Sequence, residues 1–346
     1  MMRLLLAFLA LLACAAPVRA ARTVRPGVLR VATWNLGNLF DAEDDPDNPG
    51  DDEWTPQSWR RWTDQRYLAK SSNLVEVVAL MKPDILCVQE VENKECLRTL
   101  AEMLATRPEA HPMPYYQLVN GEDRRGICVG LLSRHPIAGT TLHEFVPGLR
   151  GALHAELLVE GRPFHVIVCH WKSWLGNAAL NTRIRMCEAT GVRRVAAGIL
   201  AKDPNASLVI AGDLNDNIDG ESVLVGLRGS ADRHEVGRDA TMFYNAIGEI
   251  PESERGSFYY ARRKVWDTFD QIFVTSAMLR PAGDRGPAWR LVPSATPVAF
   301  VFKLPQMMNA NGSPRPFQRV RSKEGDRYEE GYSDHFPVCL DLVRGR

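Results

Sequence analysis

The 346-residue sequence has no close pair of cysteines and no internal repeat, and its basic and acidic residues balance at 42 each. Without a Cys-x-x-Cys spacing, a zinc site built on paired thiolates is not expected. Without a short repeat or a low-complexity linker, a solenoid or a string of tethered modules is excluded. The charge balance also leaves no long basic stripe of the kind that marks many duplex-binding proteins. Because 45% of the residues are hydrophobic, a globular protein with a large core remains.

Only the N-terminus contains a run that is typical of a targeting signal. Arg3 precedes an apolar stretch that runs to Ala16, and small residues suited to a cleavage site follow it. The apolar stretch is too short to span a bilayer, and nothing else in the sequence is a transmembrane candidate. We expect residues 1–20 to be a signal peptide and residues 21–346 to form one domain that is exported to the periplasm or secreted. A lipid anchor at Cys14 is the alternative, although the residues before it fit a lipobox poorly.

The cysteines occur singly along the chain. Four of them lie in apolar, strand-like runs and are expected to fill core space: Cys87, Cys128, Cys169 and Cys339. Cys96 and Cys187 lie in helix-like segments and are candidates for a disulfide in an oxidising compartment.

One segment is strongly acidic, since residues 41–53 contain eight carboxylates and no basic residue. Trp and Pro residues follow up to Asp64, so a long loop is predicted. A solvated insertion is the favoured interpretation, and a dedicated calcium site is the alternative. The rest of the chain is then moderately basic, which is compatible with a substrate that carries phosphate.

Strand-like and helix-like segments alternate without a break in composition. The predicted strands are residues 28–34, 85–88, 126–133, 153–159, 164–169, 208–211, 268–275 and 338–342. The predicted helices are residues 65–81, 93–106 and 178–201. Residues 281–330 are rich in Pro and Arg and show little periodicity. This alternation predicts a single α/β domain.

Polar residues stand at six of these strand ends. They are Asn35, Glu90, His170, Asp213 with Asn215, Asp270, and Asp334 with His335. Chance could supply any one of them, but all six together indicate convergence on one sheet edge. Asp334 and His335 are adjacent at the mouth of a strand, so they would face different parts of one site. A solvated turn is the alternative for this pair taken alone.

These segments resemble, in order, the motifs of the endonuclease/exonuclease/phosphatase superfamily, to which DNase I and the apurinic endonucleases belong. The matching segments are Trp34-Asn35, Gln89-Glu90, Gly212-Asp213-Leu214-Asn215, Asp270-Gln271-Ile272 and Ser333-Asp334-His335. The resemblance covers nearly all of the chain after the signal. Residues 35–41, the acidic loop, residues 123–127 and 170–173, and Gly331-Tyr332 are similar to the signature of an exported bacterial subgroup.

The resemblance implies an α/β fold, a four-layered α-β-β-α sandwich of two mixed sheets as in DNase I. It also implies hydrolysis of phosphate esters with the help of a divalent cation. Glu90 resembles the principal metal ligand, with Asn35 beside it, and Asp334 would support the metal side of the site. Because these ligands are oxygen atoms, Mg²⁺ is expected, with Mn²⁺ or Ca²⁺ as alternatives.

The same resemblance assigns residues to the reaction at phosphorus. Asp270 matches the acid that orients His335, which would accept a proton from the attacking water or stabilise the phosphoryl oxygens as an imidazolium. Asp213 and Asn215 resemble the pair that positions the nucleophile and the phosphate. His170 would supply a further hydrogen bond. A second histidine at this place favours the DNase I and sphingomyelinase side of the superfamily over the apurinic endonucleases.

Three further residues are candidates for substrate contacts. Arg125 precedes a strand and could hold a phosphate through two hydrogen bonds. Lys172 follows the strand that ends in His170 and is the second basic candidate. Trp171, like Trp174, could stack on a base, and packing under a loop is the alternative.

We therefore expect an exported, metal-dependent phosphodiesterase, a DNase I-like nuclease that acts as a monomer on nucleic acid. The alternative is a phosphatase or phosphodiesterase of small or lipid phosphoesters, such as inositol phosphates or sphingomyelin. A non-catalytic binding protein that kept the fold is disfavoured, because no member of the motif set is lost.

Overall fold

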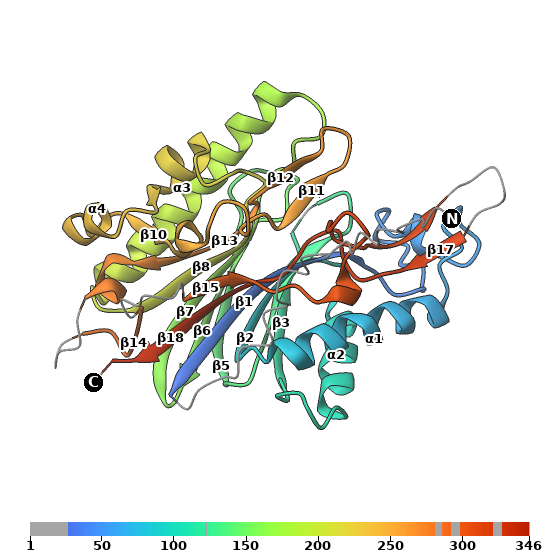
Figure 1. The fold of residues 1–346 in the computed structure, drawn as a ribbon, viewed down its shortest axis with the longest axis horizontal. Coiled ribbons are helices and arrows are strands. Elements are labelled where there is room, and N and C mark those ends of the chain that lie inside the picture. Colours follow the sequence, from blue (N-terminus) through green and yellow to red (C-terminus); the bar gives the residue numbers. More distant parts are fainter. Residues whose placement is uncertain (1–26, 122, 281–285, 292–297, 321–326, 346) are drawn as a thin grey trace, which may run out of the picture.

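The core of the protein is formed by two β-sheets that lie face to face (Figure 1). The computed structural model describes residues 27–121, 123–280, 286–291, 298–320 and 327–345. The predicted signal peptide and the lipid anchor at Cys14 lie outside the described residues.

The first sheet is mixed, because β2 runs parallel to β1 and β18 runs antiparallel to it. Its order is β14 (Trp289–Arg290), β18 (Val338–Arg344), β1 (Val28–Leu39), β2 (Ile85–Val91), β4 (Cys128–Ser133) and β3 (Tyr115–Val119), and β15 (Ala299–Val301) also pairs with β18. Every residue of β2 is buried, which is expected for a central strand with both faces covered.

The second sheet is also mixed, with β7 and β8 as its parallel pair. Its order is β5 (Ile137–His143), β6 (Ala152–Val159), β7 (Arg162–His170), β8 (Ser207–Asp213), β13 (Asp270–Thr275), β10 (Phe243–Asn245) and β9 (Gly229–Ser230). Apolar side chains of both sheets, such as Val31, Cys87, Val168 and Ile272, share one buried cluster between them.

Helices cover the outer faces and complete four layers, so the predicted sandwich is confirmed (Figure 1). Helices α1 (Asp64–Met81) and α2 (Lys94–Ala105) pack on the first sheet, and α3 (Ala178–Lys202) packs on the second together with a π-helix at Ser222–Leu227. A short helix, α4 (Arg233–Arg238), lies near β9 and β10. Local chemistry sets the ends: Lys82 adopts a left-handed conformation before Pro83 and ends α1, and the Asn93 side chain caps α2.

Two hairpins extend beyond the sheets. They are β11 (Phe258–Tyr260) with β12 (Val265–Asp267), and β16 (Phe317–Val320) with β17 (Arg327–Glu330). Four 3₁₀ turns complete the described elements at Asp52–Trp54, Ala246–Glu249, Ser276–Leu279 and Pro305–Met307. All eight predicted strands and all three predicted helices are present, and the sequence patterns missed β3, β5, the short strands from β9 to β12 and those from β14 to β17.

Two local expectations are corrected. The helical period of residues 65–81 places Leu68 on the apolar face with Leu74, Val75, Val78 and Met81, but Leu68 is 49% exposed in α1, whereas Tyr67 and Lys70 are buried. Cys96 and Cys187 do not form a disulfide: Cys96 is buried in α2, Cys187 is exposed on α3, and both are free thiols. The two helices cover different sheets, so these thiols cannot meet. The other four cysteines of the sheets are buried as expected.

Gly212 is the position where the fold depends most directly on glycine. Its φ is +152°, and a Cβ placed there would lie 1.9 Å from the carbonyl oxygen of Cys169 on the neighbouring strand. Gly212→Ala is expected to lower the free energy of unfolding by about 3 kcal/mol, since both the clash and the backbone strain must be relieved. Urea denaturation measures this change. Gly139→Ala is the control, because a Cβ at Gly139 meets nothing within 4 Å; equal losses in both variants would contradict the explanation.

Candidate active site

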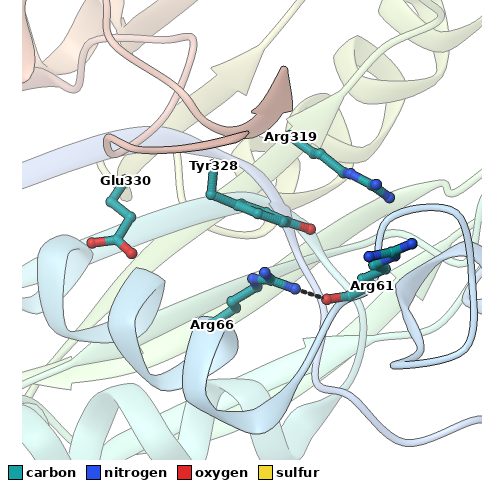
Figure 2. A pocket seen from close by; sticks show the side chains of 5 residues that line it. All are labelled: Arg61, Arg66, Arg319, Tyr328 and Glu330. Atoms are coloured by element: carbon teal, nitrogen blue, oxygen red, sulfur yellow. Dashed lines mark hydrogen bonds between the residues drawn. The ribbon is translucent and has the colours of Figure 1, made fainter. Parts of the chain in front are cut away.

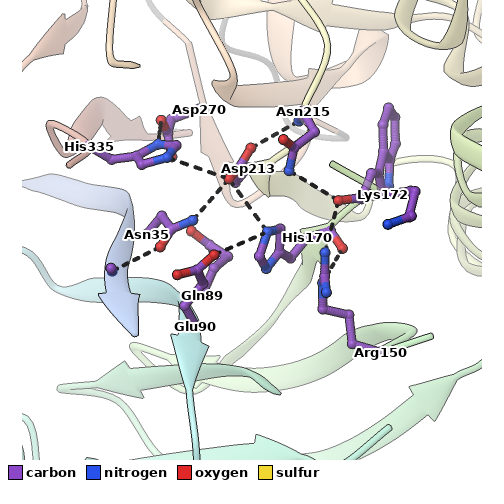
Figure 3. Close-up of polar contacts among 12 residues, drawn as sticks. Asn35, Gln89, Glu90, Arg150, His170, Lys172, Asp213, Asn215, Asp270 and His335 are labelled. Atoms are coloured by element: carbon purple, nitrogen blue, oxygen red, sulfur yellow. Dashed lines mark hydrogen bonds and ion pairs between the residues drawn. The ribbon is translucent and has the colours of Figure 1, made fainter. Parts of the chain in front are cut away.

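The predicted residues Asn35, Glu90, His170, Asp213, Asn215, Asp270 and His335 meet at one edge of the paired sheets (Figure 3). β1, β2, β7 and β8 end at this edge, whereas β13 and β18 run antiparallel to their neighbours and begin there. The register places Asp213 beside His170 on one side and beside Asp270 on the other. The pairing of strands thus brings together side chains that are far apart in sequence.

Asp213 lies at the centre of the polar contacts. Its Oδ2 accepts a hydrogen bond from Asn35 Nδ2 at 2.9 Å, and its Oδ1 accepts one from the backbone N–H of Asn215 at 2.9 Å. The Nε2 atoms of His170 and His335 lie 3.5 Å and 3.8 Å from Oδ2. The carboxylate is buried, and burial raises the pKa of Asp213 to about 6 although the charge of His335 lowers it. Asp213 is therefore ionised at neutral pH and faces two imidazoles.

His335 is held by Asp270. The Nδ1 of His335 lies 2.7 Å from Asp270 Oδ2, and both side chains are buried. Burial alone would disfavour the imidazolium, but the carboxylates of Asp270 and Asp213 outweigh burial and raise the pKa of His335 well above its usual range. The ring therefore carries a proton on Nδ1, which it donates to Asp270, and another on Nε2, which faces the site.

His170 behaves in the opposite way. Its side chain is buried, and burial followed by the positive charge of Arg150 lowers the pKa of His170 well below its usual range. Its Nδ1 is buried without a hydrogen bond in the described structure. His170 is therefore a neutral imidazole whose Nε2 lies between Asp213 Oδ2 and Glu90 Oε1, at 3.5 Å and 4.0 Å.

Glu90 projects from an irregularity in β2. The register of β2 shifts between Gln89 and Val91, and Glu90 has a φ of +59°, a value that is rare for a residue with a long side chain. Such a bulge re-aims a side chain at a strand end, and strain of this kind concentrates at functional sites. The Glu90 carboxylate is 11% exposed, and its Oε1 lies 3.3 Å from Arg125 Nη2.

The expected metal ligands supply oxygen atoms only. Asn35 Oδ1 accepts a hydrogen bond from the Gly37 backbone at 3.0 Å, which fixes the amide with its nitrogen towards Asp213. Asp334 lies at the exposed rim of the site. Its carboxylate packs against Gly37, two residues after Asn35, since a Cβ placed on Gly37 would lie 3.0 Å from Asp334 Oδ1. A strained, partly open carboxylate with an amide and a second acid nearby fits a hard divalent cation, for which no thiolate is required.

The three residues that were expected to contact the substrate lie in different environments. Arg125 is half-exposed and contacts both Glu90 and Asn38, so it lies at the site. Lys172 is half-buried, and its backbone N–H donates to Glu188. Trp171 is 2% exposed and packs in the core beneath the second sheet, so the prediction that it stacks on a base is wrong and the packing alternative is right.

Two residues of the site were missed by the sequence patterns. Lys70 of α1 is buried, and its Nζ donates to the carbonyl oxygens of Gly37 and Asn38. Burial lowers the pKa of Lys70 to about 8, partly offset by Asp334 and Glu90. Arg150 is also buried and donates to the carbonyl oxygen of His170 at 2.9 Å. Neither residue has a motif around it, and a lone basic residue in a helix or loop is usually solvated.

Comparison with known proteins places these observations in a family. Residues 30–344 match the model of the Endonuclease/Exonuclease/phosphatase family. A search of curated proteins finds no match. Among solved structures, SmcL is similar, with a TM-score of 0.53 and 18% identity over 92% of this chain and 100% of that chain.

Two further structures have the same fold. A humanized TDP2 of D. rerio with 14 mutations is 17% identical, with a TM-score of 0.53 over 91% of this chain and 99% of that chain. A beta toxin 275-280 from Staphylococcus aureus is 14% identical, with a TM-score of 0.53 over 91% of this chain and 99% of that chain. At this level of identity the similarity concerns the fold alone. In the part of the chain that the structure describes, none of the helices has the length and apolar character needed to cross a membrane.

Proposed function

Because the chain belongs to the endonuclease/exonuclease/phosphatase family, we propose that it is an exported phosphodiesterase that cleaves nucleic acid with Mg²⁺ as its cation. Membership makes the protein a metal-dependent phosphoric ester hydrolase. The proposal adds the substrate, the ion and the location. The observation that carries the chemistry is the Asp213 carboxylate, which lies between a charged His335 and a neutral His170.

The cation would be held by Glu90, with Asn35 and Asp334 as further oxygen donors. When bound, it withdraws negative charge from the phosphoryl oxygens of the substrate. Arg125 lies at Glu90 Oε1, where its guanidinium is placed to contact a second oxygen of the substrate phosphate. The site therefore concentrates positive charge where phosphoryl charge accumulates during hydrolysis.

The protonation states of Asp213 and His335 indicate which residue accepts a proton and which donates a hydrogen bond during hydrolysis. Asp213 is ionised at neutral pH and accepts hydrogen bonds from Asn35 and the Asn215 backbone, so it can accept a proton from an attacking water. His335 is already protonated and cannot act as the base; its Nε2–H instead donates to a phosphoryl or leaving oxygen. Of the two roles considered for His335, the imidazolium role is thus favoured. Asn215 and His170 hold the groups around Asp213 in place.

The pH dependence follows from these directions. The rate is expected to fall as the pH drops below about 6, because Asp213 is then protonated. It stays high through neutral pH and falls on the alkaline side, where His335 loses its proton. Asp270→Asn removes the carboxylate that raises the pKa of His335, so the alkaline limb moves to lower pH and the rate at pH 7 falls about tenfold or more.

A pH–rate profile of kcat/KM with a soluble phosphodiester measures both limbs. Asp219→Asn is the control, because Asp219 is exposed and should leave the profile unchanged. An alkaline limb that stays in place in Asp270→Asn would show that His335 does not act as a charged group.

A series of arginines supports a polyanionic substrate. Arg125 at Glu90 lies close enough to Arg60 for its charge to lower the pKa of Arg60, although burial lowers that pKa more. Beyond Arg60, a pocket of about 350 Å³ is lined by Arg61, Arg66, Arg319, Tyr328 and Glu330 (Figure 2). Arg66 packs over the Tyr328 ring at 3.9 Å. Guanidinium groups beside an aromatic ring suit a backbone phosphate and a base.

Arg66→Ala tests whether this path binds the substrate. We expect kcat/KM for DNA to fall about five- to tenfold at 0.1 M salt, with a weaker salt dependence, because one phosphate contact is lost. Hydrolysis of a small phosphodiester, which cannot reach the pocket, should be unchanged. Arg98→Ala is the control, since Arg98 is exposed on α2, where it pairs with Glu95 and Glu102.

The substrate itself is tested with Mg²⁺ or Mn²⁺ on plasmid and linear DNA, RNA, inositol phosphates, sphingomyelin and phosphomonoesters. Cleavage of DNA or RNA with the highest kcat/KM is the expected result. A preference for inositol phosphates or sphingomyelin would replace the nuclease proposal by the alternative of a small or lipid phosphoester. Fractionation of the expressing cells tests the export, which rests on residues 1–20. Size-exclusion chromatography tests whether the protein is a monomer in solution.

A further inference from the structure

A second group of carboxylates lies under the acidic loop. Ligand atoms of Asp41, Glu92 and Cys96 lie within 4.8 Å of one another, and so do those of Asp44, Asp51 and Asp52. The two groups meet where the carboxylates of Asp51 and Glu92 come within hydrogen-bonding reach of each other. Glu92 Oε2 also accepts a hydrogen bond from the Asp41 backbone at 2.8 Å.

The surroundings of Asp51 point to a missing ligand independently of the grouping of the carboxylates. Asp51 is fully buried, its Oδ2 accepts a hydrogen bond from the Asp45 backbone, and its Oδ1 is buried without a hydrogen-bond donor. Glu92 is buried as well. In the part of the chain that the structure describes, Asp41, Asp51 and Glu92 form no ion pair with Lys or Arg. Two buried carboxyl groups in contact are strongly disfavoured when both are charged, so either a cation or a shared proton is needed here.

The loop itself is folded rather than solvated throughout. Successive turns link Asn48 N to Asp45 O at 2.8 Å and Asp51 N to Asn48 O at 3.1 Å. Trp54 is buried and stacks on Phe40 with ring centroids 4.8 Å apart. The segment is therefore a largely exposed insertion, as expected, that is anchored to the core by a few buried side chains such as Asp51 and Trp54.

The loop also touches the turn that carries Arg125. A Cβ placed on Gly50 would lie 2.2 Å from the Arg125 carbonyl carbon. A Cβ placed on Gly126 would lie 2.2 Å from the side-chain oxygen of Asn48, so the loop and the turn are in direct contact at both glycines. Arg125 in turn reaches Glu90 at 3.3 Å. Any ligand that holds the loop in place would therefore also hold this turn beside the candidate active site.

We propose that Asp41, Asp51 and Glu92 bind a calcium ion that is distinct from the catalytic cation at Glu90. Carboxylates from a loop and a strand end suit the six to eight oxygen ligands and flexible geometry of Ca²⁺ better than the strict octahedron of Mg²⁺. Three carboxylates and one neutral, buried thiol do not suit Zn²⁺. The ion fastens residues 41–53 to Glu92 and so supports the turn that carries Arg125. This proposal does not depend on the substrate of the enzyme.

Terbium luminescence tests the site in the full chain, because Tb³⁺ replaces Ca²⁺ and is sensitised by a nearby tryptophan such as Trp54. The Glu90→Gln variant is used throughout, so that binding at the catalytic site does not contribute. We expect sensitised emission that Ca²⁺ displaces at much lower concentration than Mg²⁺. Ca²⁺ at about 100 times its Kd should raise the Tm by about 5 °C.

Asp51→Asn in the same background should abolish the emission and the Tm shift. Asp47→Asn is the matched control, since it removes the same charge from an exposed position in the same loop and should keep both. Circular dichroism confirms folding, and Asp41→Asn serves as the second variant if Asp51→Asn does not fold.

Three results would overturn the proposal. Loss of emission and of the Tm shift in Glu90→Gln itself would mean that the chain has one cation site, at the catalytic centre. Equal effects of Asp47→Asn and Asp51→Asn would mean diffuse attraction by the acidic loop. No response to Ca²⁺, together with an Asp51→Asn variant that is more stable than its parent, would mean that Asp51 and Glu92 share a proton instead of an ion.

Discussion

Replacing His335 by Asn is expected to lower kcat for phosphodiester hydrolysis by about a thousandfold, within the range observed for a positioned acid or base and for one charge-stabilising donor. The physical reason is the loss of the only buried imidazolium among the described site residues, held by Asp270 at 2.7 Å. Asn keeps a hydrogen-bond donor of similar reach to Asp270 but carries no charge. Steady-state kinetics on a soluble phosphodiester measure the loss, and KM should change little because the donor acts on the developing charge.

The control for this variant is His234→Asn, because His234 is exposed and distant from the motif residues in the sequence. Thermal unfolding of both variants should remain cooperative. A His335→Asn variant that keeps more than about a tenth of the wild-type kcat would assign the principal role to Asp213 and the cation, and not to the imidazolium.

Replacing Glu90 by Gln is expected to have an effect of similar or larger size. The change removes the only carboxylate that β2 directs into the site from its bulge at φ +59°. We expect the Mg²⁺ affinity to fall at least tenfold and kcat/KM at subsaturating Mg²⁺ to fall about a thousandfold or more, because the cation supplies several kcal/mol of charge stabilisation. The loss of the 3.3 Å contact with Arg125 also leaves that guanidinium less well positioned.

Calorimetric titration with Mg²⁺ separates binding from catalysis in this variant. Glu109→Gln is the control, since Glu109 is an exposed acid outside the site. If saturating Mg²⁺ restores the full rate, Glu90 serves affinity alone. If Mg²⁺ affinity is unchanged while the rate is lost, the cation is held by other residues and the assignment of Glu90 as principal ligand is wrong.

Much of the sandwich was predictable because its signals are local. A run such as residues 85–88 is apolar at every position, and a helix such as α2 repeats its apolar residues at the helical period. Short strands such as β9 and β14 were missed because two-residue segments carry no period. Their pairing is decided by neighbouring strands, whose identity no local pattern contains.

The candidate site was predictable as a set of residue types but not as a set of contacts. Asn35 and Asp213 are separated by 178 residues, and His335 and Asp270 by 65, so only the strand pairing shows that they touch. Lys70 and Arg150 were missed for the same reason, since both are ordinary basic residues until the fold buries them. Trp171 was assigned to the substrate because its neighbours carry the motif, whereas the fold turns its ring into the core.

The amino-acid sequence by itself determined the alternation of strands and helices, the family, and which acids, amides and imidazoles stand at the strand ends, because these are properties of order and spacing along the chain. Only the tertiary structure decided that His335 is charged while His170 is neutral, and that Asp51 is buried without a donor for one of its oxygens. The reason is that ionisation depends on burial and on charges within a few ångströms, and strand pairing sets both.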